Sequence, residues 1–357
     1  PLLLVPNMFA ASNIDSSKGR VIEKEGDSRV RNNAIFANVE LGYRSMLYLT
    51  LTGRNDWNSR LVNTNEESFF YPSVGLSAIV SEMVELPKFI SYLKVRGSYT
   101  EVGAPISRSG LTPGTVTTPI TGGGLIENQI YPFTDFKAER TRSYEFGLNF
   151  RLWNKLSAEV TYYKSNTYNQ TFLGDLPEYS GYKQIYLQAG NVENRGWDVT
   201  VGWQDRVSAF DYGIKINLSD VKNEVTNLGG SEMIITGNSI IRLGAPINSI
   251  YGYETEGIFQ SQEEINGAPS QFGTLKPGNL RYKDQLTVDT DGDGVMDASD
   301  GVINADDRVI LGDPFPRYTY GIDLTAGYKG FDLAIALQGV GKRDVLLGGD
   351  LVYPLFN

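Results

Sequence analysis

The chain has 357 residues and a formal net charge of −10 at pH 7, with 39 Gly, 21 Tyr and 16 Phe but no Cys and no His. The missing Cys and His exclude disulfide frameworks, thiol nucleophiles and serine–histidine catalysis, and they deprive a zinc site of its favoured ligands. The negative charge argues against a nucleic-acid partner, because phosphate binding needs a basic surface. No run of about 18 apolar residues is present, which excludes a transmembrane helix. The length is compatible with two ordinary domains or with one large β domain.

The chain begins with PLLLVPNMFAAS, which lacks the basic leader and the apolar core of a signal peptide. We therefore expect residues 1–29 to be a lead-in, a loop of a longer polypeptide inside which this numbering begins.

Alternation of apolar and polar residues with a period of two dominates the sequence from residue 35 to residue 337. Such alternation is typical of β-strands with two different faces. The apolar members of the alternating runs are Ile35, Ala37, Val39, Leu41 and Tyr43; Leu47, Leu49 and Leu51; Leu93, Val95 and Tyr99; Tyr144, Phe146, Leu148, Phe150 and Leu152; Leu156, Ala158, Val160 and Tyr162; Trp197, Val199, Val201 and Trp203; Phe210, Tyr212, Ile214, Ile216 and Leu218; Tyr318, Tyr320, Ile322, Leu324, Ala326 and Tyr328; and Phe331, Leu333, Ile335 and Leu337.

The connections between these runs are of two kinds. Short turns are expected near 43–46, 153–156, 204–210 and 328–331, and long polar connections near 55–70, 101–140, 164–196, 219–250 and 251–316. Short turns on one side and long loops on the other are the organisation of a transmembrane β-barrel. Aromatic residues that flank the short turns match an interfacial girdle: Trp153, Trp203, Phe210, Tyr328 and Phe331. The sequence therefore predicts an all-β fold, in which residues 30–357 form part of an antiparallel transmembrane β-barrel with long extracellular loops.

A soluble β-sandwich or propeller would alternate as well. Several runs here reach ten or more residues, whereas strands of soluble proteins typically have about 5–6. The polar face carries Arg, Lys and Glu, as a water-filled lumen would. These observations favour the membrane barrel and leave the soluble fold as the alternative.

An aspartate-rich segment, DTDGDGVMDASDGVINADD, occupies residues 289–307 within an expected calcium-binding-type loop at 284–312. Its spacing follows an EF-hand-type loop, in which alternate oxygen ligands surround a tight turn and a backbone carbonyl serves at the seventh position. The expected ligands are Asp289, Asp291, Asp293, the carbonyl of Val295, Asp297 and Asp300, with Gly294 at the turn. Calcium is therefore the expected cofactor, and a solvated acidic loop without metal is the alternative.

The second half of this segment is a near-copy of the first, since DGVMDASD (293–300) is followed by DGVINADD (300–307). The rhythm resembles the calcium-binding repeats of thrombospondin type 3 modules. A possible second metal site would share Asp300 and add Asn304 and Asp307, although it lacks full early ligands. Either ion would stiffen a long loop, because neither a substrate pocket nor a base for metal-assisted catalysis is visible.

Several motifs, in their order and spacing, resemble the SusC/RagA family of TonB-dependent outer-membrane transporters from about residue 30 onward. They are YPSVGLS (71–77), LKVRGSY (93–99), SYEFG (143–147), GNVENRG (190–196), YGYETEGIFQ (251–260), GDP (312–314) and GYKGFDL (327–333) through QGVG (338–341).

This resemblance implies a barrel of 22 strands around an N-terminal plug, a TonB box that contacts a periplasmic energy-transducing protein, and a SusD-like surface lipoprotein as a lid. This sequence shows no plug and no TonB box, so we expect an interior portion of a transporter whose contact with TonB depends on parts absent from this chain. Membrane lipids and lipopolysaccharide would surround such a barrel in the outer membrane of a Gram-negative, Bacteroidetes-like cell. The family usually carries a shorter form of the aspartate segment, which makes the extra residues here a departure.

The resemblance implies TonB-driven uptake of a nutrient, with a glycan or a peptide as cargo, and no enzymatic activity. Polar residues expected in the lumen are possible substrate contacts, or they fill and hydrate a wide interior: Tyr48, Arg54, Arg96, Glu145, Arg151, Tyr163 and Lys215. Loop aromatics could stack on sugars, contact a lid or pack within the loops: Tyr168, Tyr179, Tyr182, Tyr186 and Tyr251. The alternatives in function are a calcium-stabilised soluble or surface-anchored β binding module and, less favoured, a glycan hydrolase with paired carboxylates.

Overall fold

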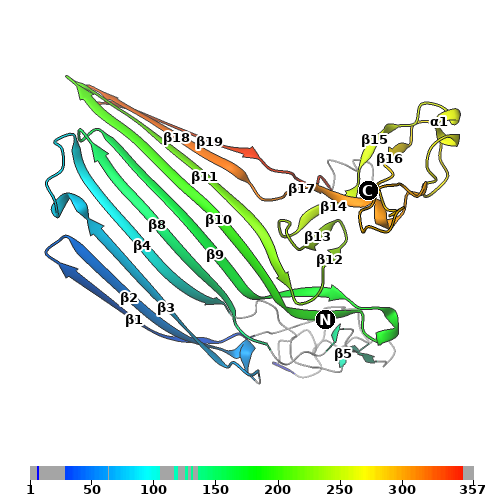
Figure 1. The fold of residues 1–357 in the computed structure, drawn as a ribbon. Coiled ribbons are helices and arrows are strands. Elements are labelled where there is room, and N and C mark those ends of the chain that lie inside the picture. The colour runs from blue at the N-terminus through cyan, green and yellow to red at the C-terminus, as the bar shows by residue number, and fades with distance from the viewer. Residues whose placement is uncertain are drawn as a thin grey trace.

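The chain forms one broad sheet of long, tilted strands that carries a smaller lobe at one end, as the computed structural model in Figure 1 shows. The structure describes residues 6–7, 29–62, 64–104, 116–119, 125–127, 130–131 and 136–348. The expected lead-in at 1–29 lies outside the described residues, apart from residues 6–7 and 29. Across the described part of the chain, no helix has both the length and the apolarity that crossing a membrane requires.

The main sheet contains ten strands in a continuous antiparallel path. In spatial order they are β1 (Asn32–Tyr43), β2 (Leu47–Asn58), β3 (Ser68–Ile79), β4 (Ile90–Ala104), β8 (Glu139–Leu152), β9 (Leu156–Asp175), β10 (Gln184–Val207), β11 (Phe210–Leu228), β18 (Arg317–Tyr328) and β19 (Phe331–Lys342). The short β7 (Ile130–Tyr131) adds a parallel pairing to β10. Among the described residues the path ends at β1 and β19, so this part of the wall is an open sheet. The expected all-β, antiparallel fold is confirmed.

Cross-strand register divides the sheet into two chemically different faces. One row in register reads Tyr48, Ser77, Arg96, Gly147, Thr161, Asp198 and Ser219. A row on the opposite side reads Val95, Leu148, Val160, Val199, Leu218 and Tyr320. Because successive side chains of a strand point to opposite faces, these rows define a polar face and an apolar face along the whole path. The predicted alternation therefore matches the observed register.

Large side chains on the apolar face are exposed, including Leu76 (54 %), Phe146 (58 %) and Leu333 (57 %). A sheet that exposes a continuous apolar face and a continuous polar face fits a membrane barrel, in which lipid covers one and water the other. A soluble sandwich would instead bury the apolar face against a second layer.

Tight turns join the strands at one end of the sheet. Arg44 and Ser45 both have positive φ (50° and 56°), as do Trp153 and Asn154 (51° and 55°). Positive φ at both central residues belongs to the hairpin turns whose twist matches the strands. The β3–β4 connection at this end contains a 3₁₀ helix, η4 (Val80–Glu82). The predicted short turns are confirmed.

The prediction of long connections at 164–196 and 219–250 was wrong in its boundaries. Strand β9 continues to Asp175, β10 begins at Gln184, and only residues 176–183, with η5 (Glu178–Ser180), connect them. Strand β11 likewise continues to Leu228. Backbone pairing extends into segments where apolar and polar residues no longer alternate regularly, so the pattern that reveals a strand in sequence is lost.

The remaining elements lie in the connections at the other end of the sheet. The β2–β3 connection contains η3 (Ser59–Leu61), and the β4–β8 connection contains the paired strands β5 (Val116–Pro119) and β6 (Leu125–Glu127). A small core packs here from Leu61, Phe69, Phe136, Ala138 and Tyr186.

The lobe consists of residues 229–316, between β11 and β18. Its antiparallel four-stranded sheet contains β12 (Met233–Thr236), β13 (Ser239–Arg242), β14 (Ser249–Tyr253) and β17 (Arg308–Gly312). It also contains the paired strands β15 (Thr255–Ile258) and β16 (Leu280–Tyr282), the helix α1 (Gln262–Asn266) and the 3₁₀ helix η6 (Ala305–Asp307). A second core joins the lobe to β9–β11 through Phe172, Val192, Val225, Leu228, Ile234 and Ile247.

Candidate functional site

The residues predicted to line a lumen share the polar face. Thr50, Gly75, Ser98, Glu145 and Tyr163 form one row in register, and Arg151, Ser157, Gly202 and Lys215 form another. With the row that contains Tyr48 and Arg96, these pairings place all seven predicted residues on this face: Tyr48, Arg54, Arg96, Glu145, Arg151, Tyr163 and Lys215.

A depression of about 500 Å³ lies in the middle of the polar face. Its lining residues are Arg96, Glu145, Glu159, Thr161, Tyr163, Asp198 and Thr200. The Arg96 guanidinium donates to Glu159 Oε1 at 2.8 Å and to Thr161 Oγ1 at 2.7 Å. Three carboxylates and one cation that the wall already holds therefore line the depression, and carboxylate oxygens can accept hydrogen bonds from hydroxyl or amino groups.

Arg54 is held in a different way, near the end of β2. Its Nε donates to Asp56 Oδ1 at 2.9 Å, and the Tyr71 hydroxyl donates to Asp56 Oδ2 at 2.7 Å. Asp56 is buried. This Arg54–Asp56–Tyr71 contact stabilises the pairing of β2 with β3, so Arg54 has a structural partner as well as a position on the polar face.

The loop aromatics separate into buried and exposed residues. Tyr186 packs in the small core, and Tyr251 is buried beneath the Arg308 guanidinium, 4.4 Å from the ring centroid. Tyr179 is 92 % exposed, and Tyr182 forms an edge contact with Tyr131 at 5.2 Å. Tyr186 and Tyr251 therefore have packing roles in this structure, whereas Tyr179 is exposed and Tyr182 is half-buried.

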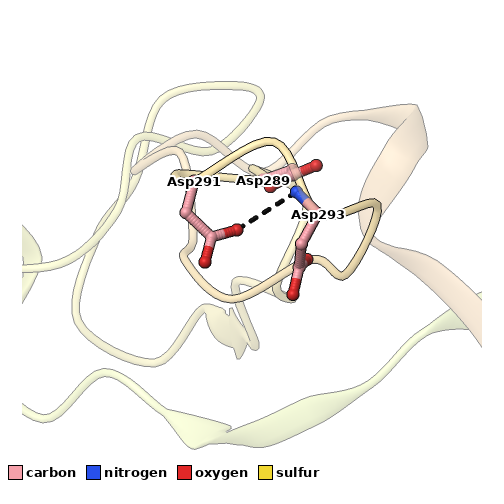
Figure 2. A group of neighbouring side chains, drawn as sticks. All are labelled: Asp289, Asp291 and Asp293. Atoms are coloured by element: carbon pink, nitrogen blue, oxygen red, sulfur yellow. Dashed lines mark hydrogen bonds between the residues drawn. The ribbon is translucent and has the colours of Figure 1, made fainter.

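The first three predicted calcium ligands cluster in the lobe. Carboxylate oxygens of Asp289, Asp291 and Asp293 lie within 4.8 Å of one another, on the tight loop that Figure 2 shows. Asp289 accepts hydrogen bonds from the backbone N–H groups of Gly292 (2.7 Å) and Gly294 (2.8 Å). Those N–H groups hold the pKa of Asp289 below its usual range. Gly292 and Gly294 have φ of 78° and 87°, the left-handed conformation that favours glycine.

The other predicted ligands have different contacts. Asp297 accepts from Thr290 Oγ1 at 2.6 Å and from the Thr290 N–H at 3.0 Å, and these bonds lower its pKa. Asp300 accepts from the N–H of Val302 at 2.8 Å and from Asn304 Nδ2 at 3.2 Å. Neither belongs to the close cluster found among the described residues. The side chain of Val295 is exposed, and its N–H donates to Asp293.

Asn304 and Asp307 form a capping box at η6. The Asn304 side chain accepts from the N–H of Asp306 at 2.7 Å, and Asp307 Oδ2 accepts from the N–H of Asn304 at 2.7 Å. Asp307 is fully buried, and its Oδ1 accepts from the N–H of Gln285 at 2.8 Å.

Two features of the long-connection end were not predicted from sequence. Asp284 lies beside Asp300 and Asp307, and burial together with these carboxylates raises its pKa. An ion-pair network joins Arg140 to Glu66 (2.5 Å) and to Glu101 (2.9 Å), and so connects the β2–β3 connection to β4 and β8. The partners lie 39 and 74 residues apart in the chain, and no local pattern in the sequence reveals such a contact.

Comparison with known proteins agrees with this architecture. The model of the family described as TonB dependent receptor-like, beta-barrel matches residues 7–340. The chain is 27 % identical over 334 residues to TonB-dependent receptor P26 and 28 % identical over 332 residues to TonB-dependent receptor P3, both from Formosa agariphila. These matches cover 87 % and 88 % of this chain and 32 % of each relative, so the chain spans about a third of their length.

Among solved structures, the match to the RagAB peptide importer in its closed-closed state covers 87 % of this chain and 33 % of the matched importer chain. The TM-score is 0.70 at 22 % sequence identity, a likeness of fold. The family contains receptors and transporters rather than enzymes and implies an outer-membrane location. The amphipathic register of the wall, the alternation of short and long connections and the family match lead to one conclusion: the chain belongs to the TonB-dependent receptor-like β-barrel family.

Proposed function

We propose that this chain is the barrel wall of a transporter that imports a peptide or glycan nutrient across the outer membrane of a Gram-negative cell, driven by TonB. The observation that carries the proposal is the continuous polar face from β2 to β18, opposite an equally continuous apolar face. Side chains on that face would contact a hydrated solute that moves along the wall.

The polar depression fits both cargo classes. Glu145, Glu159 and Asp198 offer acceptors to sugar hydroxyls and to peptide amino or N–H groups. Tyr179 and Tyr182, at the tip of the β9–β10 connection, could stack on a cargo ring or pack on a SusD-like lipoprotein lid. The fold likeness to the RagAB peptide importer supports an assembly of this kind.

The test uses the full-length transporter in a strain that lacks its own copy, grown on peptides or on oligosaccharides as the limiting nutrient. We expect growth on one class to require both the transporter and TonB. The double substitution Glu145→Gln and Asp198→Asn should slow uptake while outer-membrane abundance stays unchanged. Uptake that persists without TonB would refute energised import.

We also propose that Asp289, Asp291 and Asp293 bind calcium and stiffen the lobe, with the Val295 carbonyl, Asp297 and Asp300 completing the ligand set. Three clustered carboxylates supply the hard oxygen ligands that calcium prefers, and the two glycine turns bring them together. Backbone N–H groups of the loop donate to the same carboxylates and orient them, and each carboxylate keeps further lone pairs that can bind a cation. A second ion near Asp300, Asn304 and Asp307 belongs to the same hypothesis.

Isothermal titration of the full-length protein with calcium tests this proposal. We expect Asp289→Asn or Asp293→Asn to lower affinity at least tenfold and to increase proteolysis within 284–312. Asp306→Asn is the matched control, because it removes one charge from an exposed position outside the cluster. One or two binding transitions would distinguish one ion from two. Equal affinity of the Asp289 and Asp306 variants would overturn the assignment.

A further inference from the structure

Basic residues border the apolar face on four neighbouring strands, at the end of the sheet that carries the long connections. On β8, β9 and β10 the first charged residue beyond the apolar positions is Arg142, Lys164 and Arg195, respectively. On β11 the first charged residue is Asp220, which accepts two hydrogen bonds from Arg317. Lys222 is the next residue on the same face of β11.

Three of these cations lie side by side. Lys164 is paired in register with Arg195, and Arg195 with Lys222, on three adjacent strands. Side chains directly opposite one another have Cβ atoms about 4.5–5.5 Å apart, and like charges at that spacing are destabilising. We name Lys164, Arg195 and Lys222 the basic row.

The carboxylates that pair with the basic row lie on the side away from the apolar positions. Glu193 binds Lys164 (2.8 Å) and Arg195, and Glu224 binds Lys222 (3.0 Å). Glu193 and Glu224 are both two residues farther towards the long connections than their partners on the same strands. Arg195 and Lys222 side chains remain 56 % and 64 % exposed. The cations are therefore accessible from the side where the apolar positions begin.

Aromatic rings lie immediately beneath the basic row. Phe146, Tyr162 and Trp197 are adjacent in register, one position closer to the middle of the apolar face, and all three rings are exposed. Aromatic residues concentrate where the hydrocarbon core of a membrane meets its headgroups. The basic row thus lies at headgroup level on the lipid side of the wall.

The lobe covers the opposite face at this height and leaves the basic row uncovered. Asn223 and Val225, on the polar side of β11, are buried, and Asn223 Oδ1 accepts from the N–H of Ile247 in the lobe. Lys222 and Glu224 alternate with these residues and point the other way. What contacts the basic row must therefore approach from the membrane.

We propose that Lys164, Arg195 and Lys222 bind the phosphate groups of a phosphorylated glycolipid in the outer leaflet. Lysine and arginine are the usual phosphate ligands, and an anion at the membrane edge of the row would offset the repulsion among the three cations. The acyl chains of the same lipid would pack against the aromatic and aliphatic side chains of the apolar face. This inference rests on the outer-membrane placement in the proposed function, and not on what is transported.

The test uses the full-length transporter in detergent and native mass spectrometry with three probes: diphosphorylated lipid A, the same glycolipid without phosphates, and inorganic phosphate. We expect wild type to retain the diphosphorylated lipid and to lose the dephosphorylated one, with millimolar inorganic phosphate failing to compete. Lys164→Gln/Arg195→Gln/Lys222→Gln should lower retention at least tenfold.

Two control variants keep the result interpretable. Lys164→Arg/Arg195→Lys/Lys222→Arg keeps the charge and should retain the lipid. Lys88→Gln/Lys155→Gln/Lys329→Gln removes the same number of positive charges at the short-turn end and should retain the lipid like wild type. Equal retention by the two glutamine variants, or of the two glycolipids, would overturn the proposal, and so would displacement by free phosphate. Unchanged nutrient uptake by the basic-row variant would leave the proposed transport function standing.

Discussion

The wall and the lobe are stabilised by different interactions, although one chain forms both. In the wall, ten long strands pair through their backbones, and large apolar side chains such as Leu76 and Leu333 remain exposed. In the lobe, strands have three to five residues, and side chains of Asp and Asn hold the backbone directly. The wall therefore depends on lipid to cover one face, whereas the lobe depends on local polar contacts.

This difference shows where each region tolerates change. A residue of the wall is constrained mainly by the face it occupies, because neighbours two residues away share the same environment. A residue of the lobe is constrained by its individual partner, as the Tyr251–Arg308 contact illustrates. Substitutions matched between faces, or between buried and exposed positions, test this comparison directly.

The largest effect is expected from a charge in the middle of the apolar face. Val201 lies between Trp197 and Trp203 on that face, and Thr200 precedes it on the polar face. Val201→Arg should cost about 2–4 kcal/mol of folding free energy in a bilayer, because arginine at the membrane midplane is poorly solvated. Thr200→Arg, the matched control, should cost much less. Denaturant titration of the full-length protein in vesicles measures both, and equal costs would contradict the assignment of faces.

An intermediate effect is expected in the lobe. Tyr251→Leu removes the ring beneath Arg308 and leaves the guanidinium without its aromatic contact. We expect the lobe to lose about 2 kcal/mol from altered packing and the lost cation–π contact. Hydrogen exchange should accelerate in β14 and β17 and stay unchanged in β4 and β8. Faster exchange throughout the wall would show that the two regions unfold together.

The smallest effect is expected at the short-turn end. Lys155 Nζ lies 2.8 Å from Asp205 Oδ2, and the lysine side chain is half exposed. Lys155→Met should leave the stability nearly unchanged, because exposed ion pairs are screened by water and salt. The same denaturant titration measures it. A loss as large as that expected for Tyr251→Leu would show that this turn contributes more to the wall than an ordinary surface pair.

The sequence alone determined the wall, because strand alternation is a local property. One face of β11 can be predicted from the alternating Ile214, Ile216 and Leu218 alone, without knowledge of any other strand. The same reasoning found the tight turns and the clustered Asp289, Asp291 and Asp293, whose ligand spacing is encoded within a few residues. It failed for the outer ends of β9, β10 and β11, where apolar and polar residues do not alternate regularly and the strand has no mark in the sequence.

Only the tertiary structure decided which distant residues meet. The basic row exists because register brings Lys164, Arg195 and Lys222 from three strands to one height. The burial of Tyr251 and the approach of Asp284 to Asp307 likewise depend on long-range packing. Local sequence specifies the face of each side chain, since a strand has a fixed period of two residues. The neighbours of a side chain across the sheet depend on strand register and loop packing, which no single segment of the sequence encodes.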